Sequence, residues 1–341
     1  MGAPPQTAPS NAASPDVLAL LCRGNLEVVG RLTDASNVTL LGRLELDGAR
    51  MHCIYKPIRG EKPLWDFPGG TLAYREVLAY RVSEVAGWHC VPTTVLRPGP
   101  LGEGMVQEWI GPAPDAVLEA DDDPGGDDPD GDDWAGDDPH GDDSAGDDPD
   151  GDNVGDAVGD HRDPDAGQRG GADDDGASGA VELPEDLVAL LPSSQVPPGW
   201  LPVFRALDTD GTVLAVCHAD DPRLALIAGF DLVINNADRK APHLLPTAGH
   251  RILGVDHGLT FHVQDKLRTI LWGWAGEPLP GAVVDGLRRL RRWVAQPDDE
   301  RDSLLTGSER HHLERRIVGL LADPVFPRPP ADRTPIPWPP L

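Results

Sequence analysis

Two short stretches of the chain bring together side chains that could catalyse a reaction. Residues 235–245 read NNADRKAPHLL, and residues 254–258 read GVDHG. Transfer of a phosphoryl group from a nucleotide needs a carboxylate that orients or deprotonates the acceptor hydroxyl, and a second carboxylate that binds a metal ion. Two aspartates meet this need, so we predict that Asp238 is the catalytic base and that Asp256 is a metal ligand.

The residues that follow Asp238 add positive charge and a further possible ligand. Arg239 and Lys240 come directly after the base and could counter the charge of phosphates or of the base itself, so both are candidate catalytic residues. His243 comes five residues after Asp238 and could contact the metal or a phosphate. The stretch therefore offers a base, two cations and a second metal ligand.

A lysine and a glutamate upstream could bind the nucleotide. Lys56 ends the apolar stretch CIYKP, where a lysine is unusual unless its ammonium has a partner. Glu76 follows 20 residues later, near the start of an expected helix that would pack on that strand. A Lys–Glu pair of this kind would direct the ammonium toward the phosphates.

Each of these patterns also has a plainer explanation. An Asp-Arg pair after a helix is usually a surface ion pair or a cap, and Asp-His-Gly is usually a turn. Lys56 could bury only its stem and keep its ammonium in water. Glu76 could be an acid that the helix dipole favours in the first turn. The order and spacing of all the motifs together favour the catalytic interpretation.

The elements that must position these residues begin with a small sheet in residues 15–112. Apolar and polar residues alternate between turn signals, which predicts antiparallel strands, and Gly87 is a plausible end for the helix that packs on them. The predicted elements are a helix at 16–23, strands at 26–32, 39–46 and 49–57, a helix at 74–87, and strands at 91–99 and 104–111.

Three residues of this first part are further candidates for nucleotide binding. Gln107 and Trp109 lie in the last predicted strand. The loop at residues 33–37 is the expected phosphate loop, in which Ser36 and backbone N–H groups would hold the phosphates because no Gly-rich pattern is present.

Residues 182–325 predict a mostly helical second part. We expect helices at 185–193, 222–236, 281–296 and 308–323, with a pair of strands around Asp256 at 251–262. The Pro-rich tail at 326–341 should be extended. It could pack along the domain or offer a ligand to a protein partner.

A low-complexity segment separates the two parts. Pentapeptides such as GDDPD and GDDWA repeat from Gly126 to Asp150, and residues 121–175 hold 23 aspartates against two arginines. Like charges at this density repel, and almost nothing apolar offsets the entropy of ordering, so we predict disorder for residues 113–181, and also for residues 1–14. A solvated linker is favoured over a weak Ca²⁺ or Mg²⁺ reservoir, because the spacing does not match an EF-hand loop or a nonapeptide calcium repeat.

The composition limits the partners. The formal net charge of −28 comes mostly from the acidic segment, and an acidic balance argues against binding to nucleic acid or to an anionic membrane. No long apolar run or signal peptide is recognisable, so a cytoplasmic location is expected. The four cysteines show no CxxC spacing and are expected to be reduced thiols in the core.

The motifs resemble those of the phosphatidylinositol 3- and 4-kinase superfamily. FDLVINNADRK, followed by a histidine and GVDHG, is similar to the superfamily's catalytic and metal-binding loops, and REVLAYRVSEVAGWHCVPTTVL is similar to a segment upstream of them. HipA-type protein kinases share this core, and the whole chain resembles a group of uncharacterised actinobacterial kinase-like proteins. The resemblance implies a two-lobed, protein-kinase-like α+β fold, with an N-lobe at 15–112, the disordered acidic insert, and a C-lobe at 182–325.

The same resemblance implies a role for each matching residue. Lys56 would contact the α-phosphate, Glu76 would orient Lys56, Asp238 would be the base and Asp256 would bind the metal. Two positions depart from the pattern: His243 stands where the superfamily has a metal-binding Asn, and His257 stands where it has the Phe of Asp-Phe-Gly. Histidine suits Mg²⁺ less well than an amide oxygen does, so weaker Mg²⁺ binding, a preference for Mn²⁺ or loss of catalysis would follow.

We therefore expect an ATP-dependent kinase that uses Mg²⁺ or Mn²⁺ and transfers a phosphoryl group to a hydroxyl. A protein Ser/Thr or a small cytosolic molecule is favoured over a lipid as acceptor, because no basic membrane-facing patch is recognisable. The alternative is a pseudokinase that binds nucleotide and acts as an interaction module. A scaffold with no nucleotide site would require Lys56 and Asp256 to be ordinary surface residues.

Overall fold

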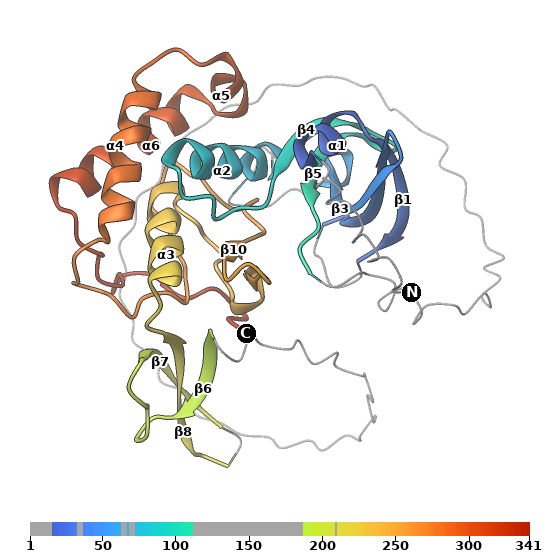
Figure 1. The fold of residues 1–341 in the computed structure, drawn as a ribbon. Helices are drawn as coiled ribbons and strands as arrows, with labels where there is room; N and C mark the ends of the chain where they lie inside the picture. Colours follow the sequence, from blue (N-terminus) through green and yellow to red (C-terminus); the bar gives the residue numbers. More distant parts are fainter. Residues whose placement is uncertain (1–15, 33–36, 63–66, 68–71, 112–186, 209) are drawn as a thin grey trace, which may run out of the picture. The chain divides into compact units, whose positions relative to one another are not determined.

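The computed structural model describes residues 16–32, 37–62, 67, 72–111, 187–208 and 210–341. Within them the protein is α+β, with antiparallel sheets and helices (Figure 1). The predictions for residues 1–14, for residues 113–181 and for Ser36 concern parts of the chain outside these described residues.

The first described part is a five-stranded antiparallel sheet with the order β1-β2-β3-β5-β4 (Figure 1). Burial alternates along residues 53–57, where Cys53, Tyr55 and Pro57 are buried. Every element predicted in this part is present within a few residues of its expected bounds. These elements are α1 (Val17–Arg23), β1 (Asn25–Arg31), β2 (Leu40–Leu46), β3 (Ala49–Pro57), the short 3-10 helix η1 (Ile58–Gly60), α2 (Leu72–Ala86), β4 (Thr94–Gly99) and β5 (Gly102–Glu108).

Helix α2 ends where its sequence predicts. Gly87 adopts a φ of +66°, the left-handed conformation that only glycine reaches without strain, and this residue turns the chain out of the helix. Val77, Leu78 and Val82 of α2 are buried in the larger of two apolar cores, together with residues of α3 and α4. The helix that carries Glu76 is therefore held by packing on the C-terminal helices as well as on the sheet.

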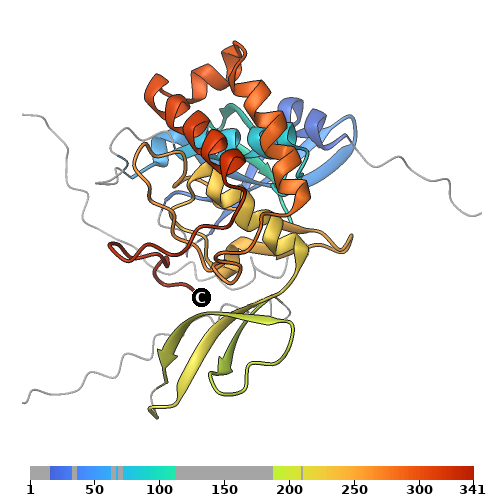
Figure 2. The ribbon, with the colours of Figure 1, turned by 90° about the vertical axis from the view of Figure 1, so that its left-hand side faces the viewer.

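The second described part combines a small sheet with helices. Figure 2 shows α3, α4 and α6 as neighbouring helices, and residues from all three are buried in the same apolar core. The elements are β6 (Val188–Pro192), β7 (Trp200–Leu207), β8 (Val213–Ala219), α3 (Pro222–Ile234), the 3-10 helix η4 (Ala241–His243), β9 (Leu244–Pro246), β10 (Ile252–Gly254), α4 (Gly281–Val294), α5 (Asp299–Leu304) and α6 (Gly307–Ala322).

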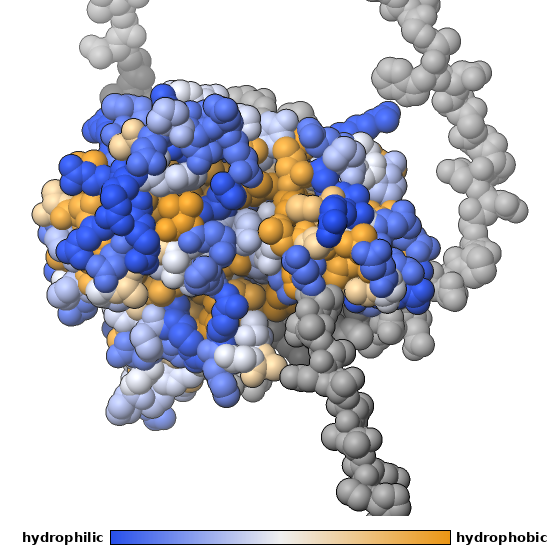
Figure 3. Space-filling view, turned by 45° about the horizontal axis from the view of Figure 1, so that its top comes forward, coloured by the Kyte–Doolittle hydropathy of each residue, from blue (hydrophilic) through white to orange (hydrophobic). Residues whose placement is uncertain are grey.

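Helix α4 shows why its sequence alternates leucine with arginine. Val283, Leu287 and Leu290 are buried, whereas Arg291 and Arg292 are exposed. Hydrophilic residues cover much of the face that carries α4, α5 and α6 (Figure 3). The predicted helices at 222–236, 281–296 and 308–323 are confirmed.

Three predictions for secondary structure and burial are wrong. The predicted helix at 185–193 is instead strand β6, which pairs with β8 in an antiparallel sheet of order β6-β8-β7. The short apolar run VALLP suits either element, and the cross-strand partner decides between them.

The predicted second strand after Asp256 is absent from residues 257–262, because Asp256 and Phe261 have φ values of +59° and +60° that interrupt extended structure. Cys22 is exposed rather than buried.

The C-terminal tail packs along the domain, which was one of the two alternatives. The carbonyl of Pro335 accepts hydrogen bonds from Thr269 N at 3.0 Å and from Trp272 Nε1 at 2.9 Å. The carbonyl of Pro340 accepts from Ala241 N at 3.0 Å, directly after the predicted catalytic residues. The tail therefore braces the segment that carries Asp238.

His218 on β8 joins the small sheet to the segment that follows the second aspartate motif. Its Nδ1 lies 2.9 Å from the Ala219 carbonyl, which can only accept a hydrogen bond, so Nδ1 is the donor. Its Nε2 accepts a hydrogen bond from Gly273 N at 3.0 Å. The ring is buried and its centroid lies 4.3 Å from that of Trp274. Burial lowers the pKa of His218 to about 4, so this side chain is neutral in the folded protein at neutral pH.

This neutral histidine makes stability depend on pH. In the unfolded chain His218 is protonated below about pH 6.5, whereas in the folded chain it is protonated only below about pH 4. The free energy of unfolding should therefore fall as the pH is lowered from 6.5 to 4, by up to about 3 kcal/mol. Urea denaturation of the wild type and of His218→Gln, at several pH values, measures this effect. The variant should show a shallower fall, and equal slopes in the two proteins would contradict the assignment.

Candidate active site

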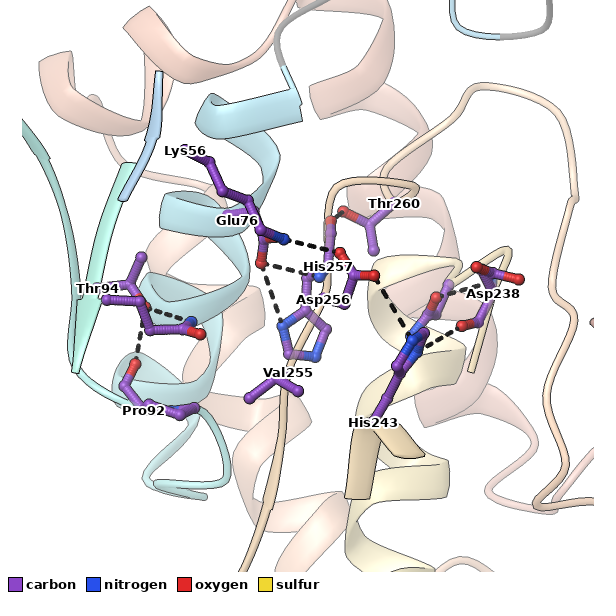
Figure 4. A network of polar contacts seen from close by, with 12 residues as sticks. Lys56, Glu76, Pro92, Thr94, Asp238, His243, Val255, Asp256, His257 and Thr260 are labelled. Carbon is purple, nitrogen blue, oxygen red and sulfur yellow. Dashed lines mark hydrogen bonds and ion pairs between the residues drawn. The ribbon is translucent and has the colours of Figure 1, made fainter. Parts of the chain in front are cut away.

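Lys56 lies between two carboxylates from distant parts of the chain. Its Nζ is 2.8 Å from Glu76 Oε1, on α2, and 2.9 Å from Asp256 Oδ1, in the loop after β10 (Figure 4). The expected pairing of Lys56 with Glu76 is therefore present, and Asp256 joins it. Neither Lys56 nor Asp256 is an unpaired surface residue.

The charges of this cluster stabilise one another. Burial disfavours the ammonium of Lys56, but the carboxylates of Asp256 and Glu76 outweigh that effect and hold its pKa above its ordinary value. The ammonium of Lys56, in turn, holds the pKa of Asp256 well below its usual range. The Asp256 side chain is 49% exposed, so solvent weakens this interaction while leaving the carboxylate open to a ligand.

Glu76 also fixes the loop that carries Asp256. Its Oε2 accepts a hydrogen bond from His257 N at 2.8 Å, so one carboxylate binds the lysine with one oxygen and the loop backbone with the other. Arg75, the neighbour of Glu76 on α2, bonds to the Thr260 carbonyl and to Glu309 on α6. These contacts tie α2 to the loop on both sides of the site.

His257 replaces the expected Phe with a side chain that both packs and accepts a hydrogen bond. It is fully buried, with its ring edge-to-face with Phe230 at 5.4 Å between centroids. Its Nε2 lies 2.8 Å from Arg239 Nη2, and because a guanidinium only donates, Nε2 must accept. Burial first, and Arg239 second, lower the pKa of His257 well below its ordinary value, so the imidazole is neutral.

Arg239 does not face the site. Its guanidinium is fully buried, with Nε 3.0 Å from Asp231 Oδ2 and Nη2 2.9 Å from Asp231 Oδ1. Nη1 donates to the carbonyls of His243 at 3.3 Å and of Val255 at 3.1 Å. The expectation that Arg239 neutralises phosphate charge does not fit this position, because its donors are used to hold the backbone on either side of the site.

Asp238 and Lys240 remain at the site. Asp238 Oδ2 lies 3.2 Å from Lys240 Nζ, with both side chains about one-fifth exposed. Burial raises the pKa of Asp238, and the positive charge of Lys240 partly offsets this. A cavity of about 120 Å³ is lined by Asp238 together with Lys56, Glu76 and Asp256, so the predicted base, metal ligand and phosphate-binding residues meet in one place.

His243 presents a lone pair toward Asp256. Its Nδ1 lies 2.9 Å from the Asp238 carbonyl, which can only accept, and 3.5 Å from Lys240 N, which can only donate. The shorter contact favours the tautomer in which Nδ1 carries the proton and Nε2 does not. Nε2 is 3.5 Å from Asp256 Oδ2 (Figure 4). Burial lowers the pKa of His243 to about 4, so the ring is neutral at neutral pH.

This arrangement fits a divalent cation held by few protein groups. A backbone carbonyl that fixes the tautomer of a ligating imidazole is the usual arrangement around protein-bound metals. In the described part of the chain, no group of three His, Cys, Asp or Glu side chains could hold a metal by itself. Asp256 and His243 would therefore share the ion with phosphate or water oxygens.

Two other predicted residues do not reach this cavity. Gln107 is buried in the sheet, where its Nε2 donates to Thr94 Oγ1 at 2.8 Å. Trp109 donates its backbone N–H to the His52 carbonyl at 3.3 Å and does not line the cavity.

Sequence reasoning missed two residues that position the site. Asn236 donates to Asp231 Oδ1 at 2.9 Å and accepts from Asp238 N at 3.0 Å, which fixes the backbone of Asp238. Asn235 adopts a φ of +55° at the end of α3 and donates to the carbonyls of His262 and Gln264. The available signal was the Asn-Asn pair at a helix end, because Asn tolerates the left-handed conformation better than other non-glycine residues.

Comparison with known proteins identifies a relative that matches nearly the whole chain. No family model matches it. The chain is 39% identical over 326 residues to a protein of Mycobacterium tuberculosis named Protein Rv2133c, and the match covers 95% of each chain. The chain belongs to the family of Protein Rv2133c. Because the match takes in nearly the whole length, it includes both the sheet that carries Lys56 and the segment that carries Asp238 and Asp256.

The buried Arg239–Asp231 pair should dominate the stability of the site. Replacing Arg239 with Met leaves the Asp231 carboxylate buried without its cation, which should cost about 3–5 kcal/mol. Arg288→Met is the matched control, because Arg288 pairs with Asp285 at the surface with both side chains 60% exposed, and it should cost no more than about 0.5 kcal/mol. Chemical denaturation measures both, and similar small losses would show that Arg239 is not essential to the loops.

Proposed function

We propose that the protein is an ATP-dependent phosphotransferase that acts on a hydroxyl acceptor. The observation that carries this proposal is the cavity in which Lys56 is held by Glu76 and Asp256 and which Asp238 also lines. A lysine paired with a helix glutamate, a metal-binding aspartate and a second aspartate near the acceptor are the parts that phosphoryl transfer requires. The resemblance to the phosphatidylinositol 3- and 4-kinase superfamily supports the same assignment.

Each group has a role that follows from its chemistry. The ammonium of Lys56 has three donors, of which Glu76 and Asp256 take two, so the third is open to a nucleotide phosphate. Asp238 orients the acceptor hydroxyl and takes its proton, and its raised pKa favours that step. Lys240, 3.2 Å from this carboxylate, stabilises the charge on it before transfer.

A divalent cation would be held by Asp256 and His243. When bound, Mg²⁺ or Mn²⁺ supplies positive charge that offsets the charge developing on the transferred group. Arg239 acts as a positioning residue for both loops rather than as a catalytic one, because its guanidinium is buried away from the cavity.

The favoured acceptor is a protein Ser/Thr or a small molecule rather than a lipid. The acidic segment would be repelled by anionic headgroups. None of the described helices is long and apolar enough to span a membrane. The location that fits ATP and such acceptors is the cytoplasm.

A nucleotide-binding pseudokinase is the second candidate. The observation that favours it is the imidazole of His243, which stands beside Asp256 where an amide is expected. His257 does not add to this case, because it has a packing and hydrogen-bonding role of its own. Under this hypothesis a protein partner would bind the Pro-rich tail, in which Trp338 is 85% exposed.

Nucleotide binding and turnover separate these two functions. ATP with a divalent cation should raise the melting temperature of the wild type, since a ligand at about 100 times its Kd stabilises by about 2.7 kcal/mol. The gain should be lost with EDTA and in Asp256→Ala. Asp238→Asn should keep the gain but turn over ATP about 10²–10⁴-fold more slowly. Unchanged turnover in Asp238→Asn would rule out its role as base, and binding without any turnover in the wild type would favour the pseudokinase.

The metal preference should depend on His243. An imidazole nitrogen suits Mn²⁺ better than Mg²⁺, which prefers oxygen ligands. In the presence of ATP, the wild type should therefore be stabilised at lower Mn²⁺ than Mg²⁺ concentrations. In His243→Asn this preference should shrink or reverse, whereas His311→Asn on the exposed face of α6 should leave it unchanged. The same metal ranking in all three proteins would show that His243 is not a ligand.

A further inference from the structure

A second cavity lies apart from the active-site cavity, against the segment that follows Asp256. It measures about 530 Å³, within the range of small-molecule sites, and it shares no lining residue with the active-site cavity. Leu232 of α3, Leu267 of the segment and Leu320 of α6 supply apolar walls. The larger part of its surface is therefore suited to an apolar ligand.

One wall of this cavity carries the guanidinium of Arg316, which makes no ion pair among the described residues, although the carboxylates of Asp265 and Glu309 lie near enough to favour its charge. Arg316 on α6 donates from Nε to the Val233 carbonyl at 2.9 Å and from Nη1 to the His262 carbonyl at 3.3 Å. Its Nη2 is buried and, among the described residues, has no hydrogen-bond partner. Asp265 also lines the cavity, but its carboxylate pairs with Arg333 at 2.8 Å.

Capping of α3 explains only part of this arrangement. The Val233 carbonyl belongs to the last turn of α3 and needs a donor from outside the helix, which Arg316 supplies. That role uses one nitrogen and leaves Nη2 unused. Burial lowers the pKa of Arg316 to about 10, against the opposing effect of the Asp265 and Glu309 carboxylates, so the group stays cationic at neutral pH with its Nη2 buried. A desolvated cation of this kind is stabilised by an anion.

Further polar groups lie on the same wall. Arg315 and His312 of α6 line the cavity beside Arg316. His312 Nδ1 lies 2.8 Å from the Ser308 carbonyl, so this nitrogen donates along the helix. We propose that the cavity binds a small amphipathic anion, with its apolar body against Leu232, Leu267 and Leu320 and its carboxylate or phosphate head at Arg315 and Arg316.

The position of the cavity gives such a ligand a route to the active site. Asn235 lines the cavity and binds the segment through His262, Gln264 and Lys266. It directly precedes Asn236, which fixes the backbone of Asp238. A bound anion would therefore brace the segment against α6, at the end of the loop that carries the base.

The test uses probes of matched chain length and different heads on the full chain. Octanoate, octyl phosphate and octanol are titrated by isothermal titration calorimetry. At least one of the two anions should bind at one site per chain, and octanol should bind at least about tenfold more weakly than that anion. The comparison of octanoate with octyl phosphate shows which head the site prefers.

Two variants locate the binding site. Gly319 lines the cavity and a Cβ built there meets no atom, so Gly319→Leu should fill the cavity without clashing with the backbone and abolish anion binding. Gly307→Leu is the control, because Gly307 lies on the same helix with equally open space but does not line the cavity. Arg316→Met should weaken the binding of the anions and leave the binding of octanol unchanged. Because that change also uncaps α3, the glycine pair decides the outcome if Arg316→Met is unstable.

Three results would overturn the proposal. The first is the failure of both anions to bind at millimolar concentration. The second is binding of octanol as tight as that of the anions. The third is unchanged anion binding in Gly319→Leu. None of these outcomes depends on whether the protein binds ATP, so the proposal stands or falls independently of the proposed function.

Discussion

The buried ion pair between Arg239 and Asp231 is the constraint on which both loops of the site depend. From a single guanidinium, hydrogen bonds reach the end of α3, the carbonyl of His243 after Asp238, the proposed base, and the carbonyl of Val255 before Asp256, the proposed metal ligand. A buried ion pair adds little net stability compared with apolar packing, but it is costly to break. Its value here is geometric, because few other arrangements of the two loops satisfy all five donors.

Around this pair the site is built in layers of polar contacts. His257 links Arg239 to the surroundings of Glu76, and Glu76 links α2 to Lys56. A movement of α2 would therefore shift both Lys56 and the loop that carries Asp256. The two histidines that depart from the superfamily pattern lie in this network as neutral side chains, each with its tautomer set by a group that can only donate or only accept.

Much of this site could be predicted from the sequence, and the omissions have physical causes. Lys56, Asp238 and Asp256 lie at or just after the ends of apolar elements, and Glu76 lies near the start of α2, so each could be picked out from the sequence. That they meet in one site was implied by the order of the motifs and by the resemblance to the kinase superfamily. The burial of Arg239 could not be predicted from the sequence, because an Asp-Arg-Lys run looks the same whether its side chains point into the protein or toward the solvent. The strand β6 was mistaken for a helix because five apolar residues carry no period, and only its partner β8 distinguishes the two.

The tail also has a practical meaning for experiments on this protein. Leu341 packs against the large apolar core, and one residue earlier the Pro340 carbonyl bonds to the loop that carries Lys240. An affinity tag fused after Leu341 would extend from a residue held against the core, next to the residue whose carbonyl bonds to Ala241. A tag placed ahead of α1 would begin from an element whose contacts are with the N-terminal sheet. Preparations that differ only in tag position could therefore differ in activity.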